Sequence, residues 1–347
     1  MISEDFEGAK ASSRGNRWLP WFNLALAILL IGLGVWYLSG RVSLNEIVMA
    51  MVLARPGYIL LGLVIMIVTM MVKAWRWQLM FRTPTESPTY GPFFWSLSLG
   101  QYVNLIVPFL RLGEVARIYA LNRQTDIAMA RSLGTLVVEK VLDAIMLAVT
   151  IGIIVPLVIL PEFVGEPGWI LWTVPVAALL VLYLLAYQTE FIAGFFRVIA
   201  QRLPTRFARR ILRWSLSGLE GLAALRSTRL SLLLVGTSAV IAFLSVLLPY
   251  VMLRAFNLPY GLVEAAVIHV VVTIATTPPS TPGKIGVFNG AVALVLLSYG
   301  MTNEAAAIGY SIAFYLVVII PQILLGSLAA SRTDWRWHKT VEQHVAA

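Results

Sequence analysis

Cysteine is absent from this sequence, and charge is scarce. The absence of cysteine excludes disulfides, thiolate nucleophiles and thiolate metal ligands. Only 12% of the 347 residues are charged, about half the fraction of an ordinary soluble domain. The three histidines, His269, His338 and His344, are far apart in the sequence, so no metal site is expected. The sequence has no Walker motif and no polar segment long enough for an ATPase domain, so we expect neither a nucleotide nor another cofactor.

Hydrophobic residues, in contrast, make up 59% of the chain. Several apolar runs approach the ~20 residues that cross a bilayer as a helix. This composition predicts an all-α polytopic membrane protein. The formal net charge of +9 does not indicate nucleic-acid binding, because excess Lys and Arg in membrane proteins mostly mark cytoplasmic loops. We expect an integral membrane protein of a prokaryotic cytoplasmic (inner) membrane.

The apolar runs predict six full spans and two interrupted segments. The spans are expected at residues 19–38, 57–72, 133–160, 169–187, 230–253 and 305–328. The interrupted segments, 93–131 and 262–299, are interpreted as re-entrant hairpins. Alternatively, residues 93–109 form a full span, or residues 262–299 cross twice and bring the total to eight spans.

The polar and basic stretches predict the orientation. Residues 1–18 and 331–347 are polar tails with basic residues, on either side of a single transmembrane domain at 19–330. Residues 191–227 alternate apolar clusters with arginine, as amphipathic helices in the cytoplasmic interface do. Most of the 26 Lys and Arg residues fall in these segments and in 73–131, which indicates that both termini are cytoplasmic.

The first interrupted segment breaks near Pro108 and then carries charge. Proline lacks a backbone N–H and disfavours helix at the preceding residue, and Gly113 is expected to release the backbone a second time. A helix that restarts near Leu112 directs free N–H groups and the positive end of its dipole toward the break. Arg111 adds a guanidinium that can hold phosphate in a bidentate fork. This pattern predicts a cradle for an anionic headgroup, whose further polar residues are Asn104, Glu114 and Arg117.

Charged side chains also lie within the third predicted span. Glu139 and Asp143 are four residues apart and share a helical face, while Lys140 can pair with Asp143 at i, i+3. Glu114 and Arg117 have the same i, i+3 spacing. Carboxylates inside a span usually face a cavity or a cation. We hypothesise a buried charge network that closes the cytoplasmic side, with the cationic partners Arg76, Arg111 and Arg117.

The second interruption is the stretch Thr-Pro-Pro-Ser-Thr-Pro-Gly-Lys-Ile-Gly at 277–286. Paired breaks in the two halves of a chain are the best sequence indication of a transporter site built from discontinuous helices. If the first break is reached from the cytoplasm and the second from outside, the halves are inverted repeats. The alternative is that the prolines only kink ordinary spans.

Four motifs occur in order across residues 20–330: Arg76-Trp77, Asn104–Pro108–Arg111–Gly113–Glu114–Arg117, Glu139-Lys140-x-x-Asp143 and Pro282-Gly283-x-x-Gly286. Together they resemble the flippase-like family, also called the lysylphosphatidylglycerol-synthase transmembrane-domain family. The resemblance implies broken helices and movement of lipids or lipid-linked headgroups between leaflets. The chain departs from the family pattern at Lys140, where arginine is expected, at Lys284, where glycine is common, and at Asn289, where a glutamate often follows.

The expected function is therefore translocation of a membrane phospholipid or isoprenoid-linked lipid, without a catalytic residue. Bifunctional relatives carry an aminoacyl-transferase domain after the membrane part. This chain ends about twenty residues after its last predicted span, so we do not expect that activity. Two other functions are compatible with the sequence. One is an interfacial lipid-modifying transferase with Glu139 or Asp143 as its base, and the other is a non-catalytic membrane partner of a lipid-processing enzyme. A homo-oligomer is compatible with all three.

Overall fold

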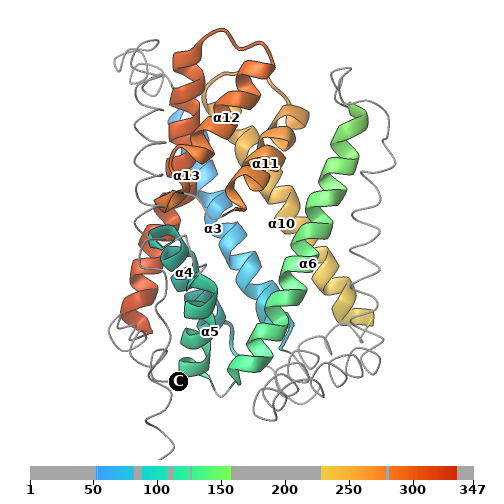
Figure 1. Ribbon diagram of the computed structural model, residues 1–347, viewed down its shortest axis with the longest axis vertical. Helices are drawn as coiled ribbons and strands as arrows, with labels where there is room; N and C mark the ends of the chain where they lie inside the picture. Colours follow the sequence, from blue (N-terminus) through green and yellow to red (C-terminus); the bar gives the residue numbers. More distant parts are fainter. Residues whose placement is uncertain are drawn as a thin grey trace, which may run out of the picture.

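The computed structural model describes residues 52, 54–81, 88–107, 112–125, 127–157, 228–278 and 281–333. Throughout these ranges the regular structure is helical, with no strand, so the predicted all-α polytopic architecture is confirmed (Figure 1). The predicted spans at 19–38 and 169–187, the interfacial segment 191–227 and the tail 1–18 lie outside the described residues. So does the second tail after residue 333.

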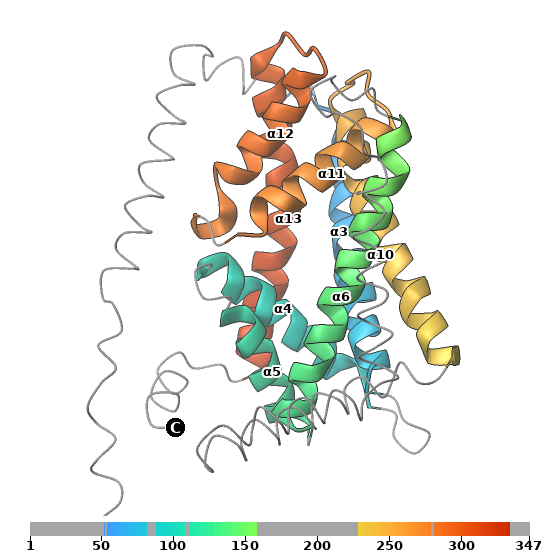
Figure 2. The same cartoon turned by 45° about the vertical axis from the view of Figure 1, so that its right-hand side comes forward.

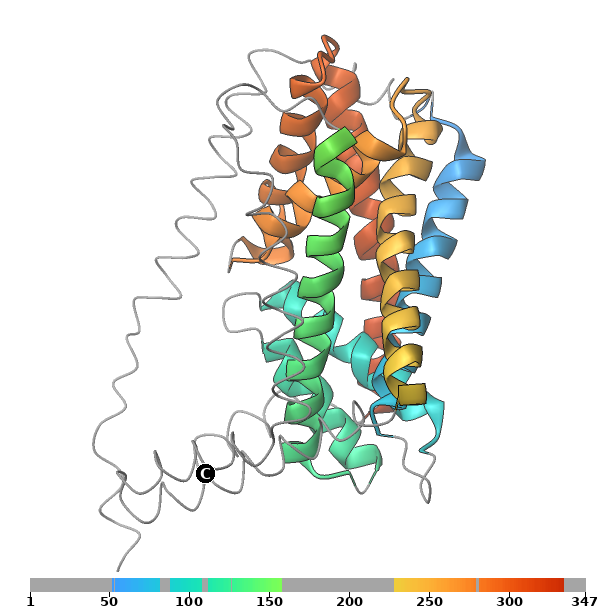
Figure 3. The same ribbon diagram turned by 90° about the vertical axis from the view of Figure 1, so that its right-hand side faces the viewer.

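Among the described residues, three helices are long and apolar enough to cross a membrane: α3 (Pro56–Leu79), α10 (Thr228–Ala255) and α13 (Glu304–Arg332). They contain the predicted spans 57–72, 230–253 and 305–328 and extend beyond each of them. At 1.5 Å per residue, even α3 with its 24 residues is roughly 36 Å long, which exceeds the ~30 Å hydrocarbon core. Helices α3 and α10 pack side by side along most of their length (Figure 3).

The fourth long helix, α6 (Met129–Ile154), has more charged residues than any of the other three. Its 26 residues include Arg131, Glu139, Lys140 and Asp143, whereas the three apolar helices carry charge mainly near their ends. It continues into a short 3₁₀ turn, η1 (Val155–Leu157). Charged side chains in the middle of such a helix require partners within the protein.

Two helical hairpins stand between these long helices. The first hairpin consists of α4 (Tyr90–Ile106) and α5 (Leu112–Gln124). The second consists of α11 (Leu262–Thr276), the 3₁₀ turn η3 (Pro282–Lys284) and α12 (Val287–Ser298). With 12 to 17 residues each, these helices are roughly 18–25 Å long, too short to cross a bilayer alone.

The hairpins occupy opposite halves of the molecule, and their tips approach each other near its middle (Figure 2). Helix α4 contacts η3 directly. The breaks therefore separate distinct helices, and the interpretation that the prolines only kink continuous spans is wrong. At the first break, Val107 leaves the helix with φ −125° and ψ 78°, a non-helical conformation, as expected for a residue that precedes a proline. Opposed hairpins are the arrangement that the inverted-repeat interpretation predicts.

Arginine is concentrated at the end of the molecule where α5 ends and α6 begins. This end is at the bottom of Figure 1. This end, called the basic end below, contains Arg76, Arg123, Arg131, Arg229 and Arg332. The opposite end of the described helices carries Arg55 and Arg254. This asymmetry is the one that the positive-inside rule predicts if the basic end faces the cytoplasm.

Candidate functional site

A central cavity of about 510 Å³ lies between the two hairpins and the long helices. Its volume is within the range of pockets that hold small organic ligands. Side chains from both halves of the chain line it, including both hairpin tips. The lining includes nine of the residues that the sequence singles out: Asn104, Gly113, Glu114, Arg117, Glu139, Lys140, Asp143, Gly283 and Lys284.

The tip of the first hairpin is held together by a glycine contact. A Cβ atom on Gly113 would run into the carbonyl oxygen of Gly100 and the side chain of Asn104. Asn104 Oδ1 also accepts a hydrogen bond of 2.9 Å from the backbone N–H of Gly113, so α4 caps the start of α5. Gly113 is helical and buried, so its role is to allow this close approach, and the expectation that it releases the backbone is wrong.

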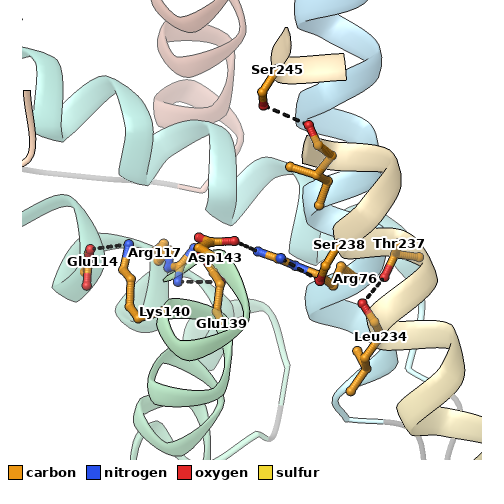
Figure 4. A network of polar contacts seen from close by, with 11 residues as sticks. Arg76, Glu114, Arg117, Glu139, Lys140, Asp143, Leu234, Thr237, Ser238 and Ser245 are labelled. Carbon is orange, nitrogen blue, oxygen red and sulfur yellow. Dashed lines mark hydrogen bonds and ion pairs between the residues drawn. The ribbon is translucent and has the colours of Figure 1, made fainter. Parts of the chain in front are cut away.

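At the basic side of the cavity, ion pairs connect α3, α5 and α6 (Figure 4). Arg76 Nη2 donates to Asp143 Oδ1 at 2.7 Å, and Arg76 Nη1 donates to Ser238 Oγ of α10 at 2.9 Å. Arg76 is only 1% exposed, so its charge depends on these partners. The described structure therefore contains the charge network that the sequence predicts, although its role in closing the cytoplasmic side stays a prediction.

Arg117 forms the most enclosed pair of this network. Its two Nη atoms donate to the two carboxylate oxygens of Glu139 at 3.3 and 2.8 Å. The guanidinium carbon lies 4.9 Å from the ring centroid of Trp77, and the Trp77 indole N–H donates to Thr135 Oγ1 at 3.0 Å. The fork-to-fork geometry joins α5 firmly to α6.

The two pairs that the spacing within single helices allows do not form. Glu114 pairs with Lys140 at 3.0 Å and not with Arg117, and Asp143 pairs with Arg76 and not with Lys140. An i, i+3 spacing allows a local pair, but partners on facing helices are available here. We call these six residues the charge belt: Arg76, Glu114, Arg117, Glu139, Lys140 and Asp143. The belt has three charges of each sign and is neutral.

Lys73 adds a positive charge that the belt does not balance. It lines the cavity from α3, and within the ranges that the structure describes no hydrogen bond or ion pair to it is present. In the sequence, Lys73 stands out only as the first residue of the basic stretch 73–131. Its spacing of three residues from Arg76 places both on one face of a helix, and that signal could have identified it. His269 and Gln101 also line the cavity and were missed as site residues.

The tip of the second hairpin is a tight turn. Lys284 N–H donates to Thr281 O at 2.8 Å, and Gly283 has φ 65° and ψ 0°, the values of the third position of a type II turn with proline before it. Tyr315 of α13 donates through its hydroxyl to Gly283 O at 2.6 Å. Lys284 itself has φ 62°, which costs a non-glycine residue about 1–3 kcal/mol.

Other predicted residues lie away from the cavity or outside the described ranges. Gly286, with φ 84°, precedes α12, and Asn289 donates to Ser311 Oγ at 3.3 Å; neither lines the cavity. Pro108 and Arg111 lie outside the described residues, so the phosphate-holding role of Arg111 stays a prediction. Over the described part of the chain, no cluster of His, Asp and Glu could hold a metal ion.

Comparison with known proteins places these features in a family context. A family model described as "Lysylphosphatidylglycerol synthase TM region" matches residues 24–326. The chain is 26% identical over 131 residues to a UPF0104 membrane protein of Methanocaldococcus jannaschii, a match that covers 37% of this chain and 39% of that relative's length. It is 24% identical over 303 residues to a UPF0104 membrane protein of Methanothermobacter thermautotrophicus, covering 80% of this chain and 87% of the relative. No solved structure matches.

Proposed function

Because the chain belongs to the lysylphosphatidylglycerol synthase transmembrane-region family, we propose that it moves an anionic lipid headgroup between the membrane leaflets through the central cavity. The phosphate of a phospholipid or of an isoprenoid-linked lipid supplies the charge that this cavity would recognise. We also propose that the protein resides in the cytoplasmic membrane of a prokaryote, with its basic end inside. The acyl or isoprenoid chains would stay in the lipid.

The observation that carries this proposal is the uncompensated charge of Lys73 in a cavity whose other buried charges are paired. The positive and negative charges of the charge belt cancel, so the belt itself gives no net attraction for an anion. The positive charge of Lys73 is additional to it. An ammonium group deep in a membrane protein is costly unless it has a partner. A headgroup phosphate without a cation of its own, as in phosphatidylglycerol, would be that partner, whereas in a zwitterionic headgroup such as phosphatidylcholine the choline ammonium already balances the phosphate.

Two structural features support a transport path. The hairpin tips reach the cavity from opposite ends, so a displacement of either hairpin would open it toward one leaflet (Figure 2). The charge belt joins α5 to α6 and α6 to α3 on the basic side. Breaking its more exposed pair, Glu114 with Lys140, would loosen the first hairpin first. The energy source would be an ion gradient, the membrane potential or the lipid gradient.

Reconstitution tests the proposal. Purified protein is placed in phosphatidylcholine vesicles with a trace of acyl-labelled phosphatidylglycerol, and leaflet exchange is followed by chemical quenching of the outer label. We expect wild-type protein to accelerate exchange of phosphatidylglycerol more than exchange of acyl-labelled phosphatidylcholine. Lys73→Met should remove this preference, because methionine keeps the length of the side chain but not its charge. Arg123→Gln, an exposed substitution at the end of α5, is the control for lost positive charge.

Exchange of phosphatidylglycerol no faster than in protein-free vesicles would overturn the proposal. Chemical conversion of the labelled lipid would instead support the lipid-modifying transferase. A Lys73→Met protein that folds and keeps the wild-type preference would show that the cavity charge does not select the headgroup.

A further inference from the structure

We propose that the lipid reaches the central cavity from the side, through an opening between α5 and α6, and that its acyl chain lies in a groove on α6 outside that opening. The ion pair between Glu114 and Lys140 stands at the opening and separates the groove from the cavity. This inference rests on the proposed function and deepens it, because it assigns the hydrocarbon part of the lipid to a site beside the headgroup cavity.

The groove is the first observation. A hollow of about 570 Å³ lies along one face of α6, where it is lined by the apolar side chains Leu133, Leu136, Val137, Val141 and Ala144. These positions follow one another at intervals of one, three or four residues, so they form a continuous stripe on one side of the helix. Val137 is 50% exposed, so the stripe is accessible from outside the protein. A hydrocarbon chain fits such a surface, whereas a polar headgroup would lose hydrogen bonds there.

The connection between the groove and the cavity is the second observation. Glu114 of α5 and Lys140 of α6 line both hollows, and their side chains are joined at 3.0 Å. They lie at the end of the charge belt opposite to Arg76 (Figure 4). Both side chains are partly exposed, whereas each of the other two pairs of the belt includes a buried arginine. Separation of Glu114 from Lys140 would therefore join the groove to the cavity.

The depth of this pair is the third observation. Lys140 lies eleven residues after Met129, the first residue of α6, which is roughly 16 Å along the helix axis from the basic end. That distance is about half of the ~30 Å hydrocarbon core. Charged side chains at such a depth are costly in contact with lipid and normally face the protein interior or a water-filled cavity. A partly exposed pair beside an apolar groove therefore suits a place where polar headgroups pass.

A phospholipid with a net negative charge is the occupant that fits both parts. Its phosphate can replace the Glu114 carboxylate as the partner of Lys140, because a lysine ammonium pairs with either anion. Beyond this pair, Lys73 lies in the lining of the same cavity. The acyl chain does not have to cross the charge belt, since the groove holds it on the outer side of the opening.

Val137→Trp tests the groove. The indole should fill the space beside the opening, and we expect exchange of acyl-labelled phosphatidylglycerol to be roughly tenfold slower than with wild-type protein. Ile153→Trp is the matched control, because Ile153 is 59% exposed on the same helix and does not line the groove. This control should exchange the lipid at close to the wild-type rate. Thermal unfolding in detergent should be similar for both variants.

Photochemical labelling of the wild-type protein gives a second, independent measurement. Phosphatidylglycerol with a diazirine in one acyl chain is irradiated in phosphatidylcholine vesicles that contain the protein, and labelled peptides are identified by mass spectrometry. We expect labelling within residues 133–144, and we expect added unlabelled phosphatidylglycerol to reduce it. The exposed residues Val240 and Phe243 of α10 serve as the reference for ordinary contact with lipid.

Two results would each overturn the inference and leave the proposed function standing. One is equal exchange by Val137→Trp and Ile153→Trp. The other is labelling of residues 133–144 that is no stronger than labelling of Val240 and Phe243, or that unlabelled phosphatidylglycerol does not reduce. If wild-type protein exchanges no lipid, the proposed function fails, and the labelling then decides independently whether the groove holds an acyl chain.

Discussion

The guanidinium of Arg117 binds both carboxylate oxygens of Glu139 and lies over the ring of Trp77, so one side chain joins α5, α6 and α3. Arg117 and Glu139 are 5% and 8% exposed. A buried charge that loses its partner is far more costly than the same pair left intact. The stability of the first hairpin therefore depends on this pair.

Glu139→Gln should destabilise the protein by about 3–5 kcal/mol, because it leaves the Arg117 guanidinium buried without a counter-charge. The measurement is thermal or denaturant unfolding in detergent micelles. Asp143→Asn should act in the same direction through Arg76 but less strongly, since the Asp143 side chain is 41% exposed. If both variants fold and transport like wild type, the network hypothesis has to be abandoned.

The pair between Glu114 and Lys140 offers a charge-reversal test. The side chains are 24% and 48% exposed, so either single reversal should change the free energy of unfolding by less than about 1 kcal/mol. We expect Glu114→Lys or Lys140→Glu to change the exchange rate of labelled lipid, because like charges would then face each other across the gap between α5 and α6. The double reversal should restore the rate. A double variant no better than the single ones would argue against a gating role for this pair.

Gly113→Ala tests the glycine contact in the first hairpin. The added methyl group meets the Gly100 carbonyl and the Asn104 side chain, and we expect a loss of about 1–3 kcal/mol in the free energy of unfolding. Gly290→Ala in α12 is the matched control, because its Cβ would meet nothing within 4 Å. That substitution should be neutral or stabilising, as alanine favours helix over glycine. Equal stability of the two variants would contradict the close packing of α4 on α5.

Tyr315→Phe tests the attachment of the second hairpin. It removes the hydroxyl that donates to Gly283 O at 2.6 Å, and the expected cost is about 1 kcal/mol. Tyr310→Phe is the control within the same helix: its hydroxyl donates to Pro249 O at 3.0 Å, away from the cavity. Both variants should lose similar stability in unfolding measurements, but only Tyr315→Phe should slow phosphatidylglycerol exchange. Equal effects of both variants on exchange would show that the turn needs no anchor.

Much of the fold follows from local properties of the chain. Apolar runs long enough to cross a bilayer predicted α3, α10 and α13, and each of these helices contains its predicted span. The breaks were predictable because proline removes a backbone donor and disfavours helix before it, as at Val107. Composition alone identified the membrane class. These inferences needed only the physics of the backbone and of its solvent.

The sequence indicated Arg76 and Arg117 as cationic partners of the carboxylates in the third predicted span, but which residue pairs with which was decided by tertiary structure. Spacing within one helix allowed Glu114 to pair with Arg117 and Lys140 with Asp143, yet each finds its partner on a facing helix. A sequence shows which residues share one face of a helix, but the packing of two helices decides which residues that face contacts. The role of Gly113 changed for the same reason, because its contact is with Gly100 on another helix. Lys73 became a site residue only when the fold placed it at a cavity whose other buried charges are matched.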